Sequence, residues 1–153
     1  MYSEIITNGI IKALRDELTA ASVYIAMAET TTEDGLKEEL LQHSKEEFEH
    51  YGKLIHYALK HSIVVNYSID SSTMNKVPSS TEEILKIVQG LETAAIVDYK
   101  QLALEARNNN DLETEQFFIE LMKAEQEHFD DLSVFTGKHR TLATSVLANL
   151  KIK

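Results

Sequence analysis

The sequence contains no cysteine and no tryptophan, and only one proline and five glycines among its 153 residues. Without cysteine, thiolate zinc sites, iron–sulfur clusters and cysteine nucleophiles are all excluded. Disulfides are excluded too, as in most proteins of a reducing compartment, and we expect a cytoplasmic protein. Because Pro78 is the only proline, few positions force a helix to stop, which favours long helices.

Long apolar runs and clusters of basic residues are also missing. No apolar run approaches the roughly 20 residues that a membrane span requires, and the segment Met1–Glu4 does not resemble a secretory signal. The formal net charge is -10, whereas nucleic-acid backbones are bound by clustered Lys and Arg. The nearest such cluster, residues 138–140, reads as a solvated turn. We therefore expect neither a membrane nor a nucleic-acid partner.

What the sequence does contain is typical of helices. Apolar residues make up 43% of it, and Glu, Leu, Ala and Lys are abundant, which favours an all-α fold over a sheet. The length suits a single domain over residues 1–153 with a sizeable core. Helical periodicity predicts four long helices, over about 3–30, 36–61, 80–108 and 111–137.

The helix ends carry recognisable signals. Thr32 or Asp34 can cap the second helix, and Ser80 with Glu83 forms a capping box at the start of the third. Gly137 is a plausible C-terminal cap for the fourth helix. The pattern over 141–150 allows a short fifth helix.

The connections predict the topology. Short turns join the first helix to the second and the third to the fourth, so each pair is expected to be antiparallel. The link between the pairs, residues 62–79, has roughly 18 residues, which is long for a compact domain. At about 3.3 Å per extended residue it can return along the full length of a helix of about 40 Å. We therefore expect a four-helix bundle with one long crossover between helices two and three.

Each predicted helix has a stripe of apolar residues that faces the core, here called its seam. Near the middle of each seam a charged residue replaces an apolar one. Steps of three and four residues along the seams place one glutamate on each helix: Glu17, Glu47, Glu92 and Glu125. Two of the seams add a histidine three residues later, His50 and His128. The Glu-x-x-His spacing puts both side chains on one helix face, one turn apart.

Buried carboxylates at one level of a bundle need a partner of opposite charge. An unpaired ionised carboxylate costs several kcal/mol to bury, and no Lys or Arg lies on these seams. Two divalent cations would balance four carboxylates, and two neutral imidazoles would complete the ligand set. The six residues therefore predict a dinuclear metal site.

The two halves of the sequence look like a diverged repeat, which strengthens the prediction. Glu17 precedes Glu47 by 30 residues and Glu92 precedes Glu125 by 33. Tyr24 and Tyr99 each follow the first glutamate of their half by seven residues. Two interpretations of these tyrosines stay open, as hydrogen-bond donors to the ligand carboxylates or as amphipathic core residues. His43, one turn before Glu47, reads better as a hydrogen-bonded core histidine than as a supporting residue of the site.

These residues resemble a known family. Over roughly residues 5–137 the chain is similar to bacterioferritins and the related Dps-like and rubrerythrin-type ferritins, all of the ferritin-like superfamily. The matching stretches are 16–18 with Tyr24, 46–50, 90–92 and 124–128. The resemblance implies Glu17, Glu92 and the two Glu-x-x-His pairs as iron ligands, two irons per subunit, with Glu47 and Glu125 bridging. It implies a ferroxidase that oxidises Fe²⁺ with O₂ or H₂O₂ and stores the product in a homo-oligomeric cage.

Some family features are missing. Bacterioferritins bind haem through a Met directly after the first Glu-x-x-His glutamate, but that position is Phe48 here, so no such haem is expected. Rubrerythrins add a ligand at the position of Ala95 and often carry a Cys-rich module. Dps-like relatives often carry cysteines near the site.

Three functions remain open from the sequence. The favoured one is an iron-storage or detoxification ferritin. The second is an enzyme on the same site, such as a manganese catalase or an oxygenase, since carboxylates and imidazoles also suit manganese. The third is a metal-free structural bundle. The native metal, the oxidant and the number of subunits are left undetermined.

Overall fold

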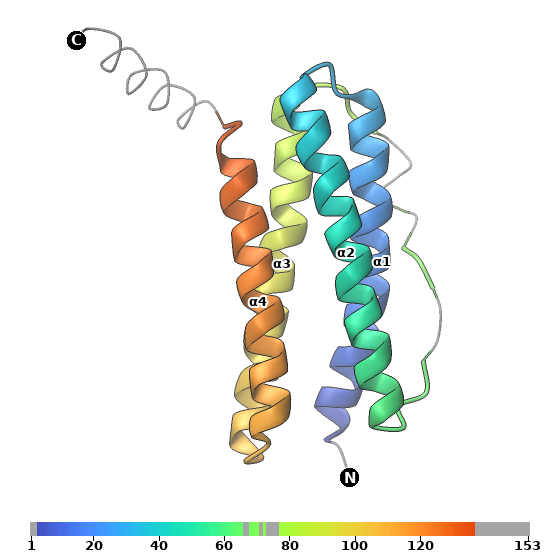
Figure 1. The fold of residues 1–153 in the computed structure, drawn as a ribbon, viewed down its shortest axis with the longest axis vertical. Helices are drawn as coiled ribbons and strands as arrows, with labels where there is room; N and C mark the ends of the chain where they lie inside the picture. The colour runs from blue at the N-terminus through green and yellow to red at the C-terminus, as the bar shows by residue number, and fades with distance from the viewer. Residues whose placement is uncertain (1–2, 66–67, 71, 73–76, 137–153) are drawn as a thin grey trace, which may run out of the picture.

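The chain forms four long α-helices in a computed structural model that describes residues 3–65, 68–70, 72 and 77–136 (Figure 1). The helices are α1 (Glu4–Thr30), α2 (Asp34–Lys60), α3 (Thr81–Asn108) and α4 (Leu112–Ser133). The described residues contain no strand, so the all-α prediction is confirmed. Within the same residues no helix is both long and apolar enough to cross a membrane.

Three of the four helices begin at a side-chain cap. The hydroxyl oxygen of Ser3 accepts the N–H of Ile6 at the start of α1. Ser80 accepts the N–H of Glu83 at the start of α3, as predicted. The carboxylate of Asp111 accepts the N–H of Thr114 at the start of α4. Each cap satisfies a backbone donor that the first turn leaves free.

The predicted ends of α2 and α4 need correction. The N-cap of α2 is Glu33, which makes no side-chain capping bond, so neither Thr32 nor Asp34 caps this helix. Helix α4 ends at Ser133, four residues before Gly137. Gly137 and the proposed fifth helix over 141–150 lie outside the described residues.

A long crossover joins the two helical hairpins. In Figure 1, α1 and α2 are antiparallel, as are α3 and α4, while α2 and α3 run in the same direction. The described residues of the connection between α2 and α3 lie beside α1. Two hydrogen bonds hold it to α1: Asp70 N–H donates to Thr19 Oγ1 (3.0 Å), and the Thr30 hydroxyl donates to the Pro78 carbonyl (2.7 Å). The predicted bundle with one long crossover is confirmed.

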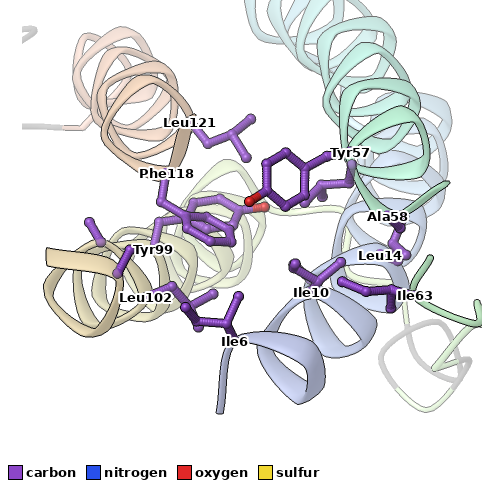
Figure 2. Close-up of a cluster of buried hydrophobic side chains, with 14 residues drawn as sticks. Ile6, Ile10, Leu14, Tyr57, Ala58, Ile63, Tyr99, Leu102, Phe118 and Leu121 are labelled. Carbon is purple, nitrogen blue, oxygen red and sulfur yellow. The ribbon is translucent and has the colours of Figure 1, made fainter. Parts of the chain in front are cut away.

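Two apolar clusters fill the interior. One contains Ile10, Leu54 and Phe118, and Figure 2 shows Phe118 against Tyr99 in it; these two rings stack with centroids 5.9 Å apart. The other contains Met27 and Leu40. Along each helix the seam glutamate lies between residues of the two clusters, so the charged layer sits between two apolar ones.

The first cluster generates a stability prediction. Phe118 is fully buried, so Phe118→Ala should lower the free energy of unfolding by about 3–5 kcal/mol through lost burial and a cavity. Leu112→Ala is the control on the same helix, because Leu112 is 74% exposed and should change stability by no more than about 0.5 kcal/mol. Urea denaturation at fixed protein concentration measures both. Equal effects of the two substitutions would contradict this packing.

Candidate metal centre

The structure brings all six predicted ligands together inside the bundle. They come from all four helices, and each is between 1% and 4% exposed. The heptad pattern explains this arrangement, because a seam position faces the core whatever residue occupies it. The residues form two groups of four in which the nearest donor atoms lie within 4.8 Å of one another.

The first group surrounds His50 and consists of Glu17, Glu47, His50 and Glu125. Nδ1 of His50 lies 2.9 Å from Oε1 of Glu125, 3.2 Å from Oε2 of Glu47 and 3.7 Å from Oε2 of Glu17. One ring nitrogen thus faces three carboxylates from three different helices.

The second group surrounds His128 in the same way and consists of Glu47, Glu92, Glu125 and His128. Nδ1 of His128 lies 3.1 Å from Oε1 of Glu47, 3.5 Å from Oε2 of Glu125 and 3.7 Å from Oε2 of Glu92. Glu17 belongs to the first group alone and Glu92 to the second alone.

Glu47 and Glu125 belong to both groups. Each turns one carboxylate oxygen toward His50 and the other toward His128. Two shared carboxylates between two sets of terminal ligands suit a pair of neighbouring cations. This geometry supports the bridging role expected for Glu47 and Glu125.

The two tyrosines hold the unshared carboxylates. The Tyr24 hydroxyl on α1 donates to Oε1 of Glu92 on α3, and the Tyr99 hydroxyl on α3 donates to Oε1 of Glu17 on α1. Both rings are buried, at 0% and 2% exposure. The two open interpretations are thus both realised: each ring packs in the core while its hydroxyl orients a carboxylate of the site.

Buried carboxylates shift the pKa values at the site strongly. Burial, together with the neighbouring Glu47, raises the pKa of Glu17 well above its usual value. Burial, with Glu125 nearby, also raises the pKa of Glu92 to about 8. Burial would raise the pKa of Glu47 as well, but hydrogen bonds with Glu17 and both histidines lower it strongly.

The pKa values of His50 and His128 are raised, whereas burial lowers the pKa of most imidazoles. Burial alone lowers the pKa of His50, but the carboxylates of Glu125, Glu17 and Glu47 raise it to about 11. Burial is likewise outweighed at His128, whose pKa is raised strongly by Glu125, Glu47 and Glu92. These shifts favour protonated imidazoles at His50 and His128 and protonated carboxyl groups at Glu17 and Glu92, which would offset the charge of the other carboxylates in the absence of metal.

His43 lies against this site without belonging to either group. It is 1% exposed, and its ring stacks on His128 with centroids 4.3 Å apart. Neither ring nitrogen makes a hydrogen bond among the described residues, although Nε2 lies 3.1 Å from Oε1 of Glu39. The predicted core position is right, but the predicted hydrogen bonding is wrong. Burial and the neighbouring His128 lower the pKa of His43 to about 4, so it is neutral.

The contact between Glu46 and His128 was not predicted from the sequence. The carboxylate of Glu46 lies 2.7 Å from Nε2 of His128, on the side of the ring that faces away from the two groups. The Glu46 side chain is one-third exposed. The spacing gave no signal for a partner 82 residues away, since Glu46 lies beside the seam rather than on it.

The donor set fits a pair of divalent cations. Carboxylate oxygen and imidazole nitrogen suit iron and manganese, and no thiolate is present that would select softer metals. Oε2 of Glu92 is buried without a hydrogen-bond partner among the described residues, whereas Oε1 of Glu125 lies 2.9 Å from Nδ1 of His50. Orphaned buried acceptors are rare in proteins and are explained where an ion binds.

The chain matches a known protein family. A family model described as a ferritin-like domain matches residues 8–142, and the chain belongs to this family. A comparison with curated protein sequences finds no match.

Solved structures share the fold. A PmFTN variant soaked in iron overnight is 22% identical, with 87% of each chain covered and a TM-score of 0.74. A bacterioferritin from Rhodobacter capsulatus, solved with a metal-free dinuclear site and haem iron, is 24% identical. The alignment covers 84% of this chain and 81% of that one, with a TM-score of 0.74.

The charge balance of the site predicts a proton release. Binding two divalent cations requires neutral His50 and His128 and ionised Glu17 and Glu92, whose pKa values are all raised. Two Co²⁺ ions should therefore displace about four protons per chain near pH 7. Because protons compete with Co²⁺ for these groups more strongly as the pH falls, the Co²⁺ affinity should drop steeply between pH 8 and pH 6. Titration in a weakly buffered indicator solution counts the protons, and a release of fewer than one would contradict the assigned charges.

The tyrosine hydroxyls generate a second prediction. Tyr99→Phe removes the donor that orients Glu17 and should weaken Co²⁺ binding by about 10- to 100-fold. Tyr57→Phe is the matched control, because its buried hydroxyl bonds Thr114 instead of a carboxylate of the site. Calorimetric titration measures both affinities. If the control weakens Co²⁺ binding as much as Tyr99→Phe does, the orienting role of Tyr99 is wrong.

Proposed function

We propose that this chain is an iron-storage or detoxification ferritin that oxidises Fe²⁺ at a dinuclear site inside its helical bundle. The proposed ligands are Glu17, Glu47, His50, Glu92, Glu125 and His128. The observation that carries the proposal is the pair of buried donor groups that share Glu47 and Glu125. The iron-soaked PmFTN variants and the dinuclear bacterioferritin among the similar structures support iron as the metal.

The reaction follows from two Fe²⁺ held side by side. Each Fe²⁺ loses one electron, and O₂ accepts both electrons with two protons to give H₂O₂, or H₂O₂ accepts them with two protons to give two waters. Carboxylates stabilise Fe³⁺ more than Fe²⁺ because they are hard anionic donors. The residues contribute by holding the two ions at neighbouring positions, and the Tyr24 and Tyr99 hydroxyls fix the outer carboxylates.

The ferric product would then accumulate in a homo-oligomeric cage, as in the family that the chain resembles. Two irons per chain are expected at the dinuclear site, and manganese is the alternative metal. Haem is not part of the proposal, because Phe48 is 45% exposed on α2 and offers no ligand atom.

One observation favours a second function, an enzyme acting on a small molecule at the same site. A cavity of about 370 Å³ lies between α1 and α3 and reaches Glu17 and Glu92. Such an enzyme would hold two metal ions per chain and no more. Rapid disproportionation of peroxide without net iron oxidation would identify the catalase form.

Iron loading separates these functions. We expect anaerobic titration to show about two Fe²⁺ bound per chain, and aerobic loading to deposit many more within an oligomer. Size-exclusion chromatography with light scattering, before and after loading, measures both quantities. A monomer or dimer that retains only two irons would exclude storage. A chain that binds no iron would leave the metal-free structural bundle as the remaining function.

Two neighbouring glutamates of α2 test the ligands. Glu47→Gln should slow Fe²⁺ oxidation by at least about 100-fold, because it removes a charge shared by both groups. Glu49→Gln changes the same chemistry two residues away on an exposed position and should leave the rate within about twofold. Stopped-flow absorbance of the ferric product measures both. Similar rates for the two variants would remove Glu47 from the proposed site.

A further inference from the structure

The cavity between α1 and α3 has a charged mouth and a charged inner end. Small side chains, among them Ala13, Ala20 and Ala95, form part of its walls. Its inner end is formed by carboxylates of the proposed metal site, Glu17 and Glu92 among them. At about 370 Å³ it has room for roughly ten waters, so an ion inside it could keep much of its hydration.

A single lysine bridges the mouth. Nζ of Lys12 on α1 lies 2.5 Å from Oδ2 of Asp16 on the same helix and 2.6 Å from Oδ2 of Asp98 on α3. All three side chains line the cavity and are between 39% and 50% exposed. The ammonium thus already occupies a position between two carboxylates of facing helices, which is where a cation entering the cavity would first bind.

The remaining charges at the mouth leave it acidic. Asp70 of the crossover lines the cavity as a third carboxylate, and its backbone N–H bond to Thr19 holds it against α1. Arg15 lies 3.7 Å from Asp16 and offsets part of this charge. Among the described residues at the mouth, three anionic groups outnumber two cationic ones, and the departure of Lys12 increases this negative excess.

The inner end points to a cation independently. Glu92 and Glu125 both line the cavity, and Oε2 of Glu92 is buried without a hydrogen-bond partner among the described residues. The mouth and the site are also close along each helix, because Asp16 precedes Glu17 and Asp98 precedes Tyr99, which holds Glu17. Carboxylates therefore lie at both ends of a short path.

We propose that divalent cations enter the dinuclear site through this cavity, and that Lys12 closes the mouth until a divalent cation displaces its ammonium from Asp16 and Asp98. The inference rests on the proposed function for its inner site. Exposed ion pairs are worth about 1 kcal/mol or less, so the lysine side chain leaves readily. A divalent ion is attracted by the two carboxylates twice as strongly as the ammonium at equal distance. An uncharged organic substrate would gain nothing from this acidic mouth.

The test follows binding rates with Co²⁺ alone, so that no oxidation is involved. Stopped-flow absorbance gives the bimolecular rate, and equilibrium titration gives the number of ions per chain. The double variant Asp16→Asn/Asp98→Asn should slow Co²⁺ binding by about tenfold at low salt, with about two ions still bound per chain. The difference should shrink as the ionic strength rises. Lys12→Met should speed binding severalfold.

A second ion pair provides the matched control. Lys60 and Glu113 also form an exposed pair between two segments of the bundle, but neither lines the cavity. Lys60→Met and Glu113→Gln should leave the Co²⁺ rate within about twofold. Filling the cavity with Ala95→Leu should slow binding without altering the charge of the mouth.

The outcomes distinguish the two proposals. If the wild type binds about two Co²⁺ per chain and every mouth and cavity variant binds at the wild-type rate, cations enter elsewhere; the entrance proposal falls and the proposed function stands. If Ala95→Leu slows binding while the mouth variants do not, the cavity is used but Lys12 does not close it, and the proposal is overturned as stated. If the wild type binds no Co²⁺, both proposals fall together.

Discussion

The rest of the structure depends on the burial of four carboxylates at one level of a helical bundle. Placing Glu17, Glu47, Glu92 and Glu125 in the interior opposes folding unless their charge is offset. In the absence of metal, protons can offset it, because the raised pKa values of Glu17, Glu92, His50 and His128 favour their protonated forms. Two divalent cations would offset the same charge after those protons leave. The interior is therefore close to neutral in both states, which allows one fold to hold the site empty or filled.

The arrangement of the bundle follows from the same constraint. Apolar clusters on both sides of the charged layer supply the stability that the layer does not, and they fix the four helices in register. Two tyrosine hydrogen bonds link the two hairpins. Tyr24 on α1 orients a carboxylate of α3, and Tyr99 on α3 orients a carboxylate of α1. A slip of either helix by one turn would break both hydrogen bonds together.

Much of this could be predicted from the sequence, because seam positions face the core regardless of the residue they carry. Glu47 and His50 interrupt an otherwise apolar seam, and that interruption predicts residues that the structure brings together. The long link before Ser80 predicted the crossover in the same way. Contacts between residues far apart and off the seam were not accessible: Glu46 meets His128 across 82 positions, and Lys12 meets Asp98 across 86. Periodicity reports which face a residue occupies, whereas these pairs depend on how two helices are placed relative to each other.

The internal repeat relates the two Glu-x-x-His pairs to each other but not the residues beside them. Adding 78 to Glu47 and His50 gives Glu125 and His128, but the same step takes Glu46 to Ala124 and His43 to Leu121. His128 is therefore flanked by a carboxylate and a stacked imidazole, whereas Leu121, the counterpart of His43, lies in an apolar cluster. The two Glu-x-x-His pairs offer the same ligand types, but the residues beside them differ in polarity. Two ions placed there would have unequal surroundings and would therefore be expected to differ in affinity.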